Sequence, residues 1–257
     1  RALAAKDGPI VPLIAETGGI NAMIVDATAL PEQVTDDVIT SAFRSAGQRC
    51  SALRLLCVQE DVADRILEMI EGAARALVVG DPREVSTHVG PVIDAEAKEK
   101  LDKWTAAHVS RVIFRHDSAP AAGTFVRPAI IALDRAADLT EEVFGPVLHV
   151  VRWRAGKLDQ LLDDIASNGY GLTLGIHSRI DDTAERIVSR LSNGNIYVNR
   201  NIIGAVVGTQ PFGGSGLSGT GPKAGGPNYL GRFATEQVVT VNTSAAGGNA
   251  SLLAEGE

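Results

Sequence analysis

The sequence predicts an α/β protein, in which a mainly parallel sheet carries helices on both faces. Strand-like and helix-like patterns of apolar residues alternate along most of the 257 residues, and this alternation is typical of parallel strands joined by crossover helices. The second observation is composition, because 45% of the residues are hydrophobic and only 4% are aromatic. A chain of this length and composition can bury a large core.

The expected elements follow one another in a regular order. A helix over Pro31–Ser45 begins with a proline, which suits the first helical turn. A buried strand over Ser51–Gln59 comes next, and Asp61–Leu77 is the clearest helix because its apolar residues fall on one stripe. Further helices are expected at Asp94–Ala106, Leu158–Ser167 and Asp182–Leu191, and further strands at Val112–Arg115, Val126–Ile131, Val147–Trp153, Leu172–His177 and Asn195–Asn199.

The last part of the chain has a different pattern. Residues 204–231 are irregular and rich in glycine, and an isolated strand at Gln237–Asn242 precedes a tail of small residues. A strand that has no neighbour in its own sheet often pairs with another domain or subunit. We therefore expect a homo-oligomer that forms through this C-terminal strand.

Charge and hydropathy argue against several classes of protein. The net charge is -7 and no segment is strongly basic, so we do not expect nucleic acid as a partner. No apolar run approaches the ~20 residues that span a bilayer, and Arg1–Pro12 lacks the pattern of a signal peptide. Cys50 and Cys57 are too far apart for a disulfide if the segment between them is extended. Reduced thiols and a cytoplasmic location are expected.

Two further patterns do not indicate a cofactor or metal site. Residues 214–219 match GxGxxG, but they neither follow an early strand nor open a helix, so a dinucleotide turn is not expected there. The histidines are scattered without metal-ligand spacing, which favours structural roles and predicts no metal site. They are His88, His108, His116, His149 and His177.

Cys50 and Glu16 are the candidates for chemistry. Cys50 lies between a helix end and a buried strand, where its backbone N–H can face a bound oxygen. Its neighbour Arg49 would favour the thiolate, the form that attacks carbonyl groups. Glu16 precedes two glycines at the end of an apolar run, and burial there would raise its pKa and make it a usable base. Each has a plainer interpretation: Cys50 as a small buried apolar residue, as we expect for Cys57, and Glu16 as a loop carboxylate.

Four motifs together resemble the aldehyde dehydrogenase family. They are ETGG at 16–19, GQRC at 47–50, EEVFGP at 141–146 and PFGGSG at 211–216. This resemblance covers essentially the whole chain, and it implies that Cys50 is the nucleophile and Glu16 the base. It also implies that Glu142 holds the nicotinamide ribose of NAD and that Phe144 packs near the nicotinamide.

The segments GNIYVNRN, QPFGGSGLSGTGPKAGGPNYL and TEQVVTVNTSAAGGNASLL resemble the proline utilization A family of bifunctional bacterial enzymes. The resemblance implies NAD-dependent oxidation of L-glutamate γ-semialdehyde to L-glutamate, the second step of proline catabolism. It implies that Ser51, Gly225 and Gly226 anchor the substrate α-carboxylate, since N–H groups at a glycine pair can approach an anion closely. Phe233 and Phe43 would flank the aliphatic part of the substrate, although packing in the core is an equally good interpretation of Phe43.

The rest of such an enzyme would precede residue 1. We expect a nucleotide-binding domain of the same polypeptide as a partner, and a proline dehydrogenase part with FAD further upstream. The chain would then contain the end of the nucleotide-binding domain (1–18), the catalytic domain (19–203), a substrate-anchor loop (204–232) and a pairing strand with its tail (233–257).

Three alternatives stay open. The chain is an inactive structural fragment, or a general aldehyde dehydrogenase of another substrate class, or a cysteine hydrolase or acyltransferase. The last would need a histidine beside Cys50 in space, because none is close in sequence.

Overall fold

Seven strands form the central sheet of the part of the chain that the structure describes. The computed structural model describes residues 2, 3, 5–206 and 208–242. The strands of the sheet are β1 (Asn21–Val25), β2 (Leu53–Gln59), β3 (Val112–Arg115), β4 (Ala129–Leu133), β5 (Val147–Trp153), β7 (Thr173–His177) and β8 (Asn195–Val198). Their order is β3-β4-β5-β2-β1-β7-β8, and all neighbours are parallel except β3 and β4. The predicted mainly parallel sheet is confirmed.

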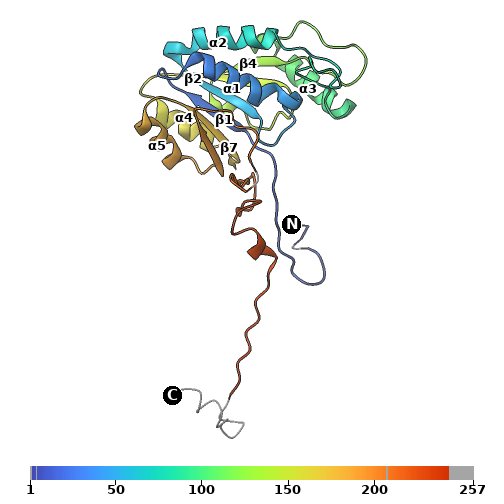
Figure 1. Cartoon of the computed structure of the whole chain (residues 1–257), viewed down its shortest axis with the longest axis vertical. Helices are drawn as coiled ribbons and strands as arrows, with labels where there is room; N and C mark the ends of the chain where they lie inside the picture. The colour runs from blue at the N-terminus through green and yellow to red at the C-terminus, as the bar shows by residue number, and fades with distance from the viewer. Residues whose placement is uncertain (1, 4, 207, 243–257) are drawn as a thin grey trace.

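Helices lie on both faces of this sheet (Figure 1). Helices α1 (Pro31–Phe43) and α2 (Glu60–Arg75) pack together on one face, and α4 (Leu158–Ala166) and α5 (Asp181–Arg190) lie on the other. The connection from β1 to β2 moves one way across the sheet, whereas those from β5 to β7 and from β7 to β8 move the opposite way. Because parallel crossovers are right-handed, these opposite directions place the helices on opposite faces.

Most predicted elements are present with small shifts at their ends. One example is α3 (Ala95–Ala107), which Asp94 caps at its N-terminus by accepting the Ala97 N–H at 2.8 Å. The central strand β1 was missed. All five of its residues are buried between β2 and β7, but five residues that begin with Asn21 are too short an apolar run to be recognised by periodicity.

The predicted strand Gln237–Asn242 is not observed in the described part of this chain. The structure assigns no strand to these residues, and Val238, Val239 and Val241 are 88%, 76% and 72% exposed. A β-strand requires a ladder of hydrogen bonds with a neighbouring strand, and no strand pairing of the described residues includes this segment. Residues 243–257 of the predicted tail lie outside the described residues.

Two arms leave the body of the protein side by side (Figure 1). The N-terminal arm, which ends at Gly18, contacts the C-terminal arm after β9 (Ser215–Gly216), a strand that pairs with β6 (Tyr170–Gly171). Thr17 N–H donates to Ser218 O, and Thr220 N–H donates to Ala15 O, both at 3.0 Å.

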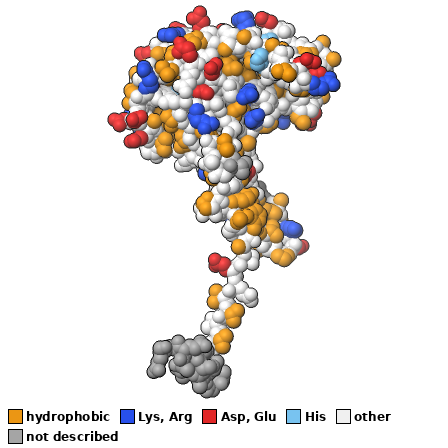
Figure 2. Space-filling model, in the orientation of Figure 1, with side chains coloured by type: hydrophobic (Ala, Val, Ile, Leu, Met, Phe, Trp, Pro, Cys, Tyr) orange, Lys and Arg blue, Asp and Glu red, His pale blue; other side chains and the backbone are white. Residues whose placement is uncertain are grey.

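Apolar side chains gather on these arms (Figure 2). Exposed examples are Ile10, Leu13, Leu230 and Phe233. Exposed apolar surface of this kind is typical of interfaces with another domain or chain. None of the helices in the described ranges is long and apolar enough to cross a bilayer.

Candidate active site

Cys50 lies in a turn between α1 and β2. After α1 ends at Phe43, the backbone passes through left-handed conformations at Ser45 (φ 55°), Ala46 (φ 53°) and Gly47 (φ 64°). A Cβ on Gly47 would lie 2.1 Å from the carbonyl oxygen of Gly145, so only glycine fits there. The left-handed turn ends the helix two residues before the predicted end and leaves Cys50 exposed ahead of β2.

The buried side chain of Asn21 fixes this turn to the sheet. Its Nδ2 donates to Cys50 O at 2.7 Å and to Ala52 O at 2.8 Å, and its Oδ1 accepts the Thr173 N–H at 3.1 Å. The Thr173 hydroxyl donates to Ser51 O. The turn of residues 44–52, the Cys50 turn, is therefore held by β1 and β7. The available sequence signal was a lone polar residue that begins an apolar run.

Several groups set the protonation of Cys50. Although the residue is exposed overall, partial loss of water around its sulfur is the largest influence and raises the pKa of the Cys50 thiol. The N–H groups of Ser51 and of Cys50 itself hydrogen-bond to the sulfur and lower the pKa. The carboxylates of Glu142 and Glu16 raise it further. The thiol form is therefore favoured in this chain until a base or a change of surroundings removes the proton.

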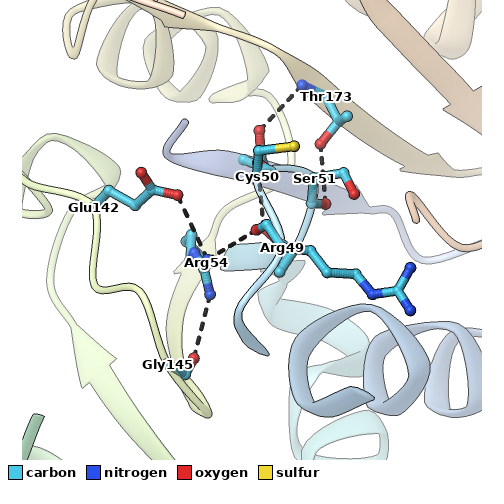
Figure 3. Close-up of polar contacts among 9 residues, drawn as sticks. Arg49, Cys50, Ser51, Arg54, Glu142, Gly145 and Thr173 are labelled. Atoms are coloured by element: carbon cyan, nitrogen blue, oxygen red, sulfur yellow. Dashed lines mark hydrogen bonds and ion pairs between the residues drawn. The ribbon is translucent and has the colours of Figure 1, made fainter. Parts of the chain in front are cut away.

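The cation near Cys50 is Arg54 rather than Arg49. Figure 3 shows the Arg49 guanidinium directed away from the sulfur, and its Nε donates to Ser45 Oγ at 3.0 Å. The prediction that Arg49 favours the thiolate is therefore wrong. Arg54 on β2 is 0% exposed, and its guanidinium interacts with the charge of Cys50. An arginine inside the apolar segment LRLLCV was the signal that could have identified it.

Glu142 reaches into the same space from the EEVFGP segment (Figure 3). Its Oε1 lies 3.5 Å from Arg54 Nη2, and the Gly19 N–H hydrogen-bonds to it and lowers its pKa, against the raising effect of burial. A Cβ on Gly18 would lie 1.7 Å from Glu142 Oε2. The ETGG, GQRC and EEVFGP motifs, far apart in sequence, thus meet around one carboxylate.

A cavity of about 420 Å³ opens beside this carboxylate. Glu142, Phe144, Gln48, Lys100 and Trp104 are among its lining residues. The Phe144 ring centroid lies 5.0 Å from the Arg54 guanidinium carbon. Sequence reasoning missed Lys100 and Trp104, because the helix that carries them has a mostly polar surface.

Glu16 is exposed, which corrects the expectation that it is buried. It lies on the projecting N-terminal arm, where a β-bridge to Gly219 holds it against the C-terminal arm. Its Oε1 lies 3.5 Å from the position of a Cβ built on Gly213. Its carboxylate is close enough to raise the pKa of Cys50, so the structure places the candidate base and nucleophile in one electrostatic neighbourhood.

The candidate carboxylate anchors are separated in this chain. Ser51 is buried beside Cys50, whereas Gly226 lines a different cavity, of about 790 Å³, along the edge strand β8. Gly225 has a φ of 75°, and the Gly226 N–H donates to Lys223 O at 2.9 Å. The structure does not bring the glycine pair into contact with the Cys50 turn.

The two aromatic candidates have different surroundings. Phe43 is 1% exposed within the hydrophobic core, so its burial favours the core-packing interpretation. Phe233 is 61% exposed on the short helical turn η4 (Leu230–Phe233), with its ring 5.5 Å from that of Tyr229. In the part of the chain that the structure describes, no histidine is hydrogen-bonded to Cys50, which gives no support to a cysteine hydrolase.

Comparison with known proteins identifies the family. The model of the aldehyde dehydrogenase family matches residues 1–239. The chain belongs to this family. Bifunctional protein PutA of Rhizobium meliloti is 58% identical over 237 residues, which cover 89% of this chain and 19% of that protein. A crystal structure of bifunctional proline utilization A superposes with a TM-score of 0.91 at 70% identity, covering 95% of this chain and 25% of that one.

Shorter members of the aldehyde dehydrogenase family are also similar. 1-Pyrroline-5-carboxylate dehydrogenase of Geobacillus kaustophilus is 38% identical over 222 residues, which cover 85% of this chain and 43% of that protein. The same enzyme from Thermus, solved with bound NAD, superposes with a TM-score of 0.80 at 35% identity, covering 86% of this chain and 43% of that one. The chain thus spans about a fifth of PutA and less than half of the shorter dehydrogenases.

The two cysteines of this family member should differ strongly in reactivity. Cys50 is exposed in a turn, whereas Cys57 is fully buried within β2, where burial raises its pKa. We expect iodoacetamide to modify Cys50 at least about tenfold faster, since reaction requires access and thiolate. Brief labelling followed by peptide mass spectrometry measures both rates in one sample. Equal modification would remove Cys50 as the reactive thiol.

Proposed function

We propose that this chain carries the nucleophile and the base of an NAD-dependent dehydrogenase that oxidises L-glutamate γ-semialdehyde to L-glutamate. The observation that carries the proposal is the meeting of three family motifs around Cys50 and Glu142. The similarity to PutA and 1-pyrroline-5-carboxylate dehydrogenases supports the substrate class and the place in proline catabolism.

The cavity beside Glu142 fits the nicotinamide half of NAD. The Glu142 carboxylate and the Lys100 ammonium offer hydrogen-bonding partners to ribose hydroxyls, and the Phe144 ring offers a flat apolar surface. NAD, when bound, accepts the hydride that leaves the substrate carbon. The adenosine half would lie against the preceding nucleotide-binding domain of the same polypeptide.

Cys50 and Glu16 would perform the two halves of the reaction. After deprotonation, the Cys50 sulfur bonds to the aldehyde carbon, and the Cys50 backbone N–H stabilises the oxyanion that forms. Once the hydride has left, the substrate is a thioester of Cys50. Glu16 takes a proton from water, the hydroxide adds to the thioester carbon, and the C–S bond breaks to release glutamate and the thiolate.

Substrate selection is proposed to depend on the carboxylate anchors. Ser51 lies beside the nucleophile, and Gly225 and Gly226 would bind the α-carboxylate of the substrate after a rearrangement of their loop, because the Gly226 N–H is engaged by Lys223 O. Phe233 would approach the aliphatic part of the substrate from the exposed end of the same arm.

Assembly is proposed to use the extended Gln237–Asn242 segment. The exposure of its three valines suits a strand whose partner belongs to another subunit, and β8 is an edge strand with a cavity along it. A homo-oligomer would form when this segment of one copy adds to a sheet edge of another. We also propose that the protein is cytoplasmic, and that an FAD-dependent proline dehydrogenase belongs to the same polypeptide.

The test uses the complete protein, meaning this chain with the sequence that precedes it in the gene. With NAD and glutamate semialdehyde it should form NADH, and Cys50→Ala should lower the rate at least about a thousandfold. Cys57→Ala removes the second cysteine of this chain, which lies outside the site, and the variant should retain activity. The 257-residue chain alone should stay at least tenfold below the complete protein. NADH formation that survives Cys50→Ala would refute the proposal, and equal use of propanal would indicate a general aldehyde dehydrogenase.

A further inference from the structure

The guanidinium of Arg54 joins the backbone of two loops that the sequence keeps far apart. Its Nη2 donates to Arg49 O at 3.1 Å in the Cys50 turn. Its Nη1 donates to Gly145 O at 3.2 Å in the EEVFGP segment, residues 141–146. Nη2 also lies 3.5 Å from Glu142 Oε1. Arg54 thus contacts Arg49, the residue before Cys50, and also Glu142 and Gly145 in the EEVFGP segment (Figure 3).

This arrangement is costly for folding. Arg54 is 0% exposed, and burial lowers its pKa to about 10 although Glu142 opposes the shift. Replacing a buried ion pair with apolar residues of similar volume is often neutral or stabilising, and the neighbours of Arg54 in β2 are leucines. Packing alone therefore does not account for an arginine at this position.

Among the residues that the structure describes, the other charged and titratable groups around Cys50 do not supply a second positive charge. Glu142 and Glu16 are negative, and Arg49 is turned away. Lys223 donates to the carbonyls of Gly194 and Gly213, and its charge interacts with that of Glu16. His149 lies behind Arg54, with its Nδ1 at 3.1 Å from Arg54 O.

His149 is neutral at physiological pH and hydrogen-bonds to the backbone carbonyl of Arg54. Burial lowers its pKa to about 4, and its Nε2 accepts the indole N–H of Trp104 at 3.0 Å. Trp104 in turn lines the cavity beside Glu142. One chain of contacts therefore runs from that cavity through Trp104 and His149 to the backbone of Arg54.

We infer that Arg54 is a positioning residue, which locks the Cys50 turn to the loop of residues 141–146 and places its buried positive charge against the Arg49 carbonyl, one residue before Cys50. It acts through the Arg49 carbonyl, the Gly145 carbonyl and the Glu142 carboxylate, and its side chain is fully buried. The inference rests on the proposed role of Cys50 as nucleophile.

The test measures the pH at which Cys50 is half-reactive toward iodoacetamide, in three variants of this chain. Glu142→Gln removes a negative charge and should lower this midpoint below that of the unmodified chain. Adding Arg54→Met to Glu142→Gln removes the cation without leaving an unpaired buried carboxylate, and should raise the midpoint by about one pH unit relative to Glu142→Gln. Adding Arg54→Lys instead retains the charge, so the midpoint should stay near that of Glu142→Gln.

The outcomes distinguish an effect of the Arg54 charge from unfolding of the chain and from failure of the proposed dehydrogenase activity. Cys57 reports folding in each sample, because it is fully buried and reacts only when the chain opens. If the Met variant exposes Cys57, Arg54→Gln on the same Glu142→Gln background takes its place, because the amide removes the charge and keeps a hydrogen-bond donor, and the same rise of about one unit is expected. A midpoint in the folded Met variant, or in its Arg54→Gln replacement, that agrees to about 0.3 unit with that of Glu142→Gln alone would overturn the inference. Neither NAD nor aldehyde enters this assay, so failure of the proposed dehydrogenase activity would be seen separately.

Discussion

Glu16→Gln in the complete enzyme should give a burst of NADH followed by slow turnover. The amide cannot take a proton from water, and loss of a general base typically lowers the rate of its step by about 10²–10⁴-fold. Thioester formation needs no water, so the first turnover should proceed. The substitution is nearly isosteric, and the arm is held by backbone bonds of Ala15 and Thr17, so its position should not change. Stopped-flow absorbance of NADH measures both phases.

Glu68→Gln is the matched control for Glu16→Gln. Glu68 is exposed on α2, outside the site, and Glu68→Gln should leave burst and steady state unchanged. Loss of the burst itself in Glu16→Gln would assign Glu16 an earlier role, such as deprotonating Cys50. That alternative has a physical basis, because burial raises the pKa of the Cys50 thiol and leaves a proton to be removed.

The periodicity of apolar residues predicted most strands of the sheet, but it missed the central strand β1 and predicted a strand at Gln237–Asn242 that the structure does not assign. The alternation of apolar segments reports how each element buries one face, and it predicted the strands β2, β3, β4, β5, β7 and β8 and the helices between them. The strand β1 was missed because its five residues carry no period of their own. The segment Gln237–Asn242 has the pattern of a strand, but pairing depends on a neighbour that local sequence does not specify.

The candidate site shows a similar division. Motif order placed Cys50 and Glu142 in one site, and the structure brings them together. The sequence neighbour Arg49 proved to be the wrong cation, since side-chain direction in a left-handed turn cannot be read from adjacency. Arg54 acts across three segments, and only the fold shows that its guanidinium lies beneath the turn.

Gly226→Val in the complete enzyme should separate substrates by their carboxylate. A Cβ on Gly226 would lie 3.0 Å from Lys223 O and 3.4 Å from Pro211 Cβ, so a branched side chain would distort the loop that is proposed to bind the anion. Each charge-assisted hydrogen bond to that anion is worth roughly 1.5–3 kcal/mol. Loss of one such bond should therefore lower kcat/KM for glutamate semialdehyde at least about tenfold.

Propanal supplies the internal comparison for this variant, because it has no carboxylate and should lose far less in kcat/KM. Gly72→Val is the matched protein control, since Gly72 lies on α2, outside the site, and a Cβ there meets nothing within 4 Å; both substrates should react nearly as before. Equal losses for the two aldehydes in Gly226→Val would mean that the glycine only shapes the backbone and that the carboxylate is bound elsewhere. Unchanged kinetics with both aldehydes would remove Gly226 from the site, because the side chain of valine cannot enter this turn without displacing the Lys223 carbonyl that now accepts the Gly226 N–H.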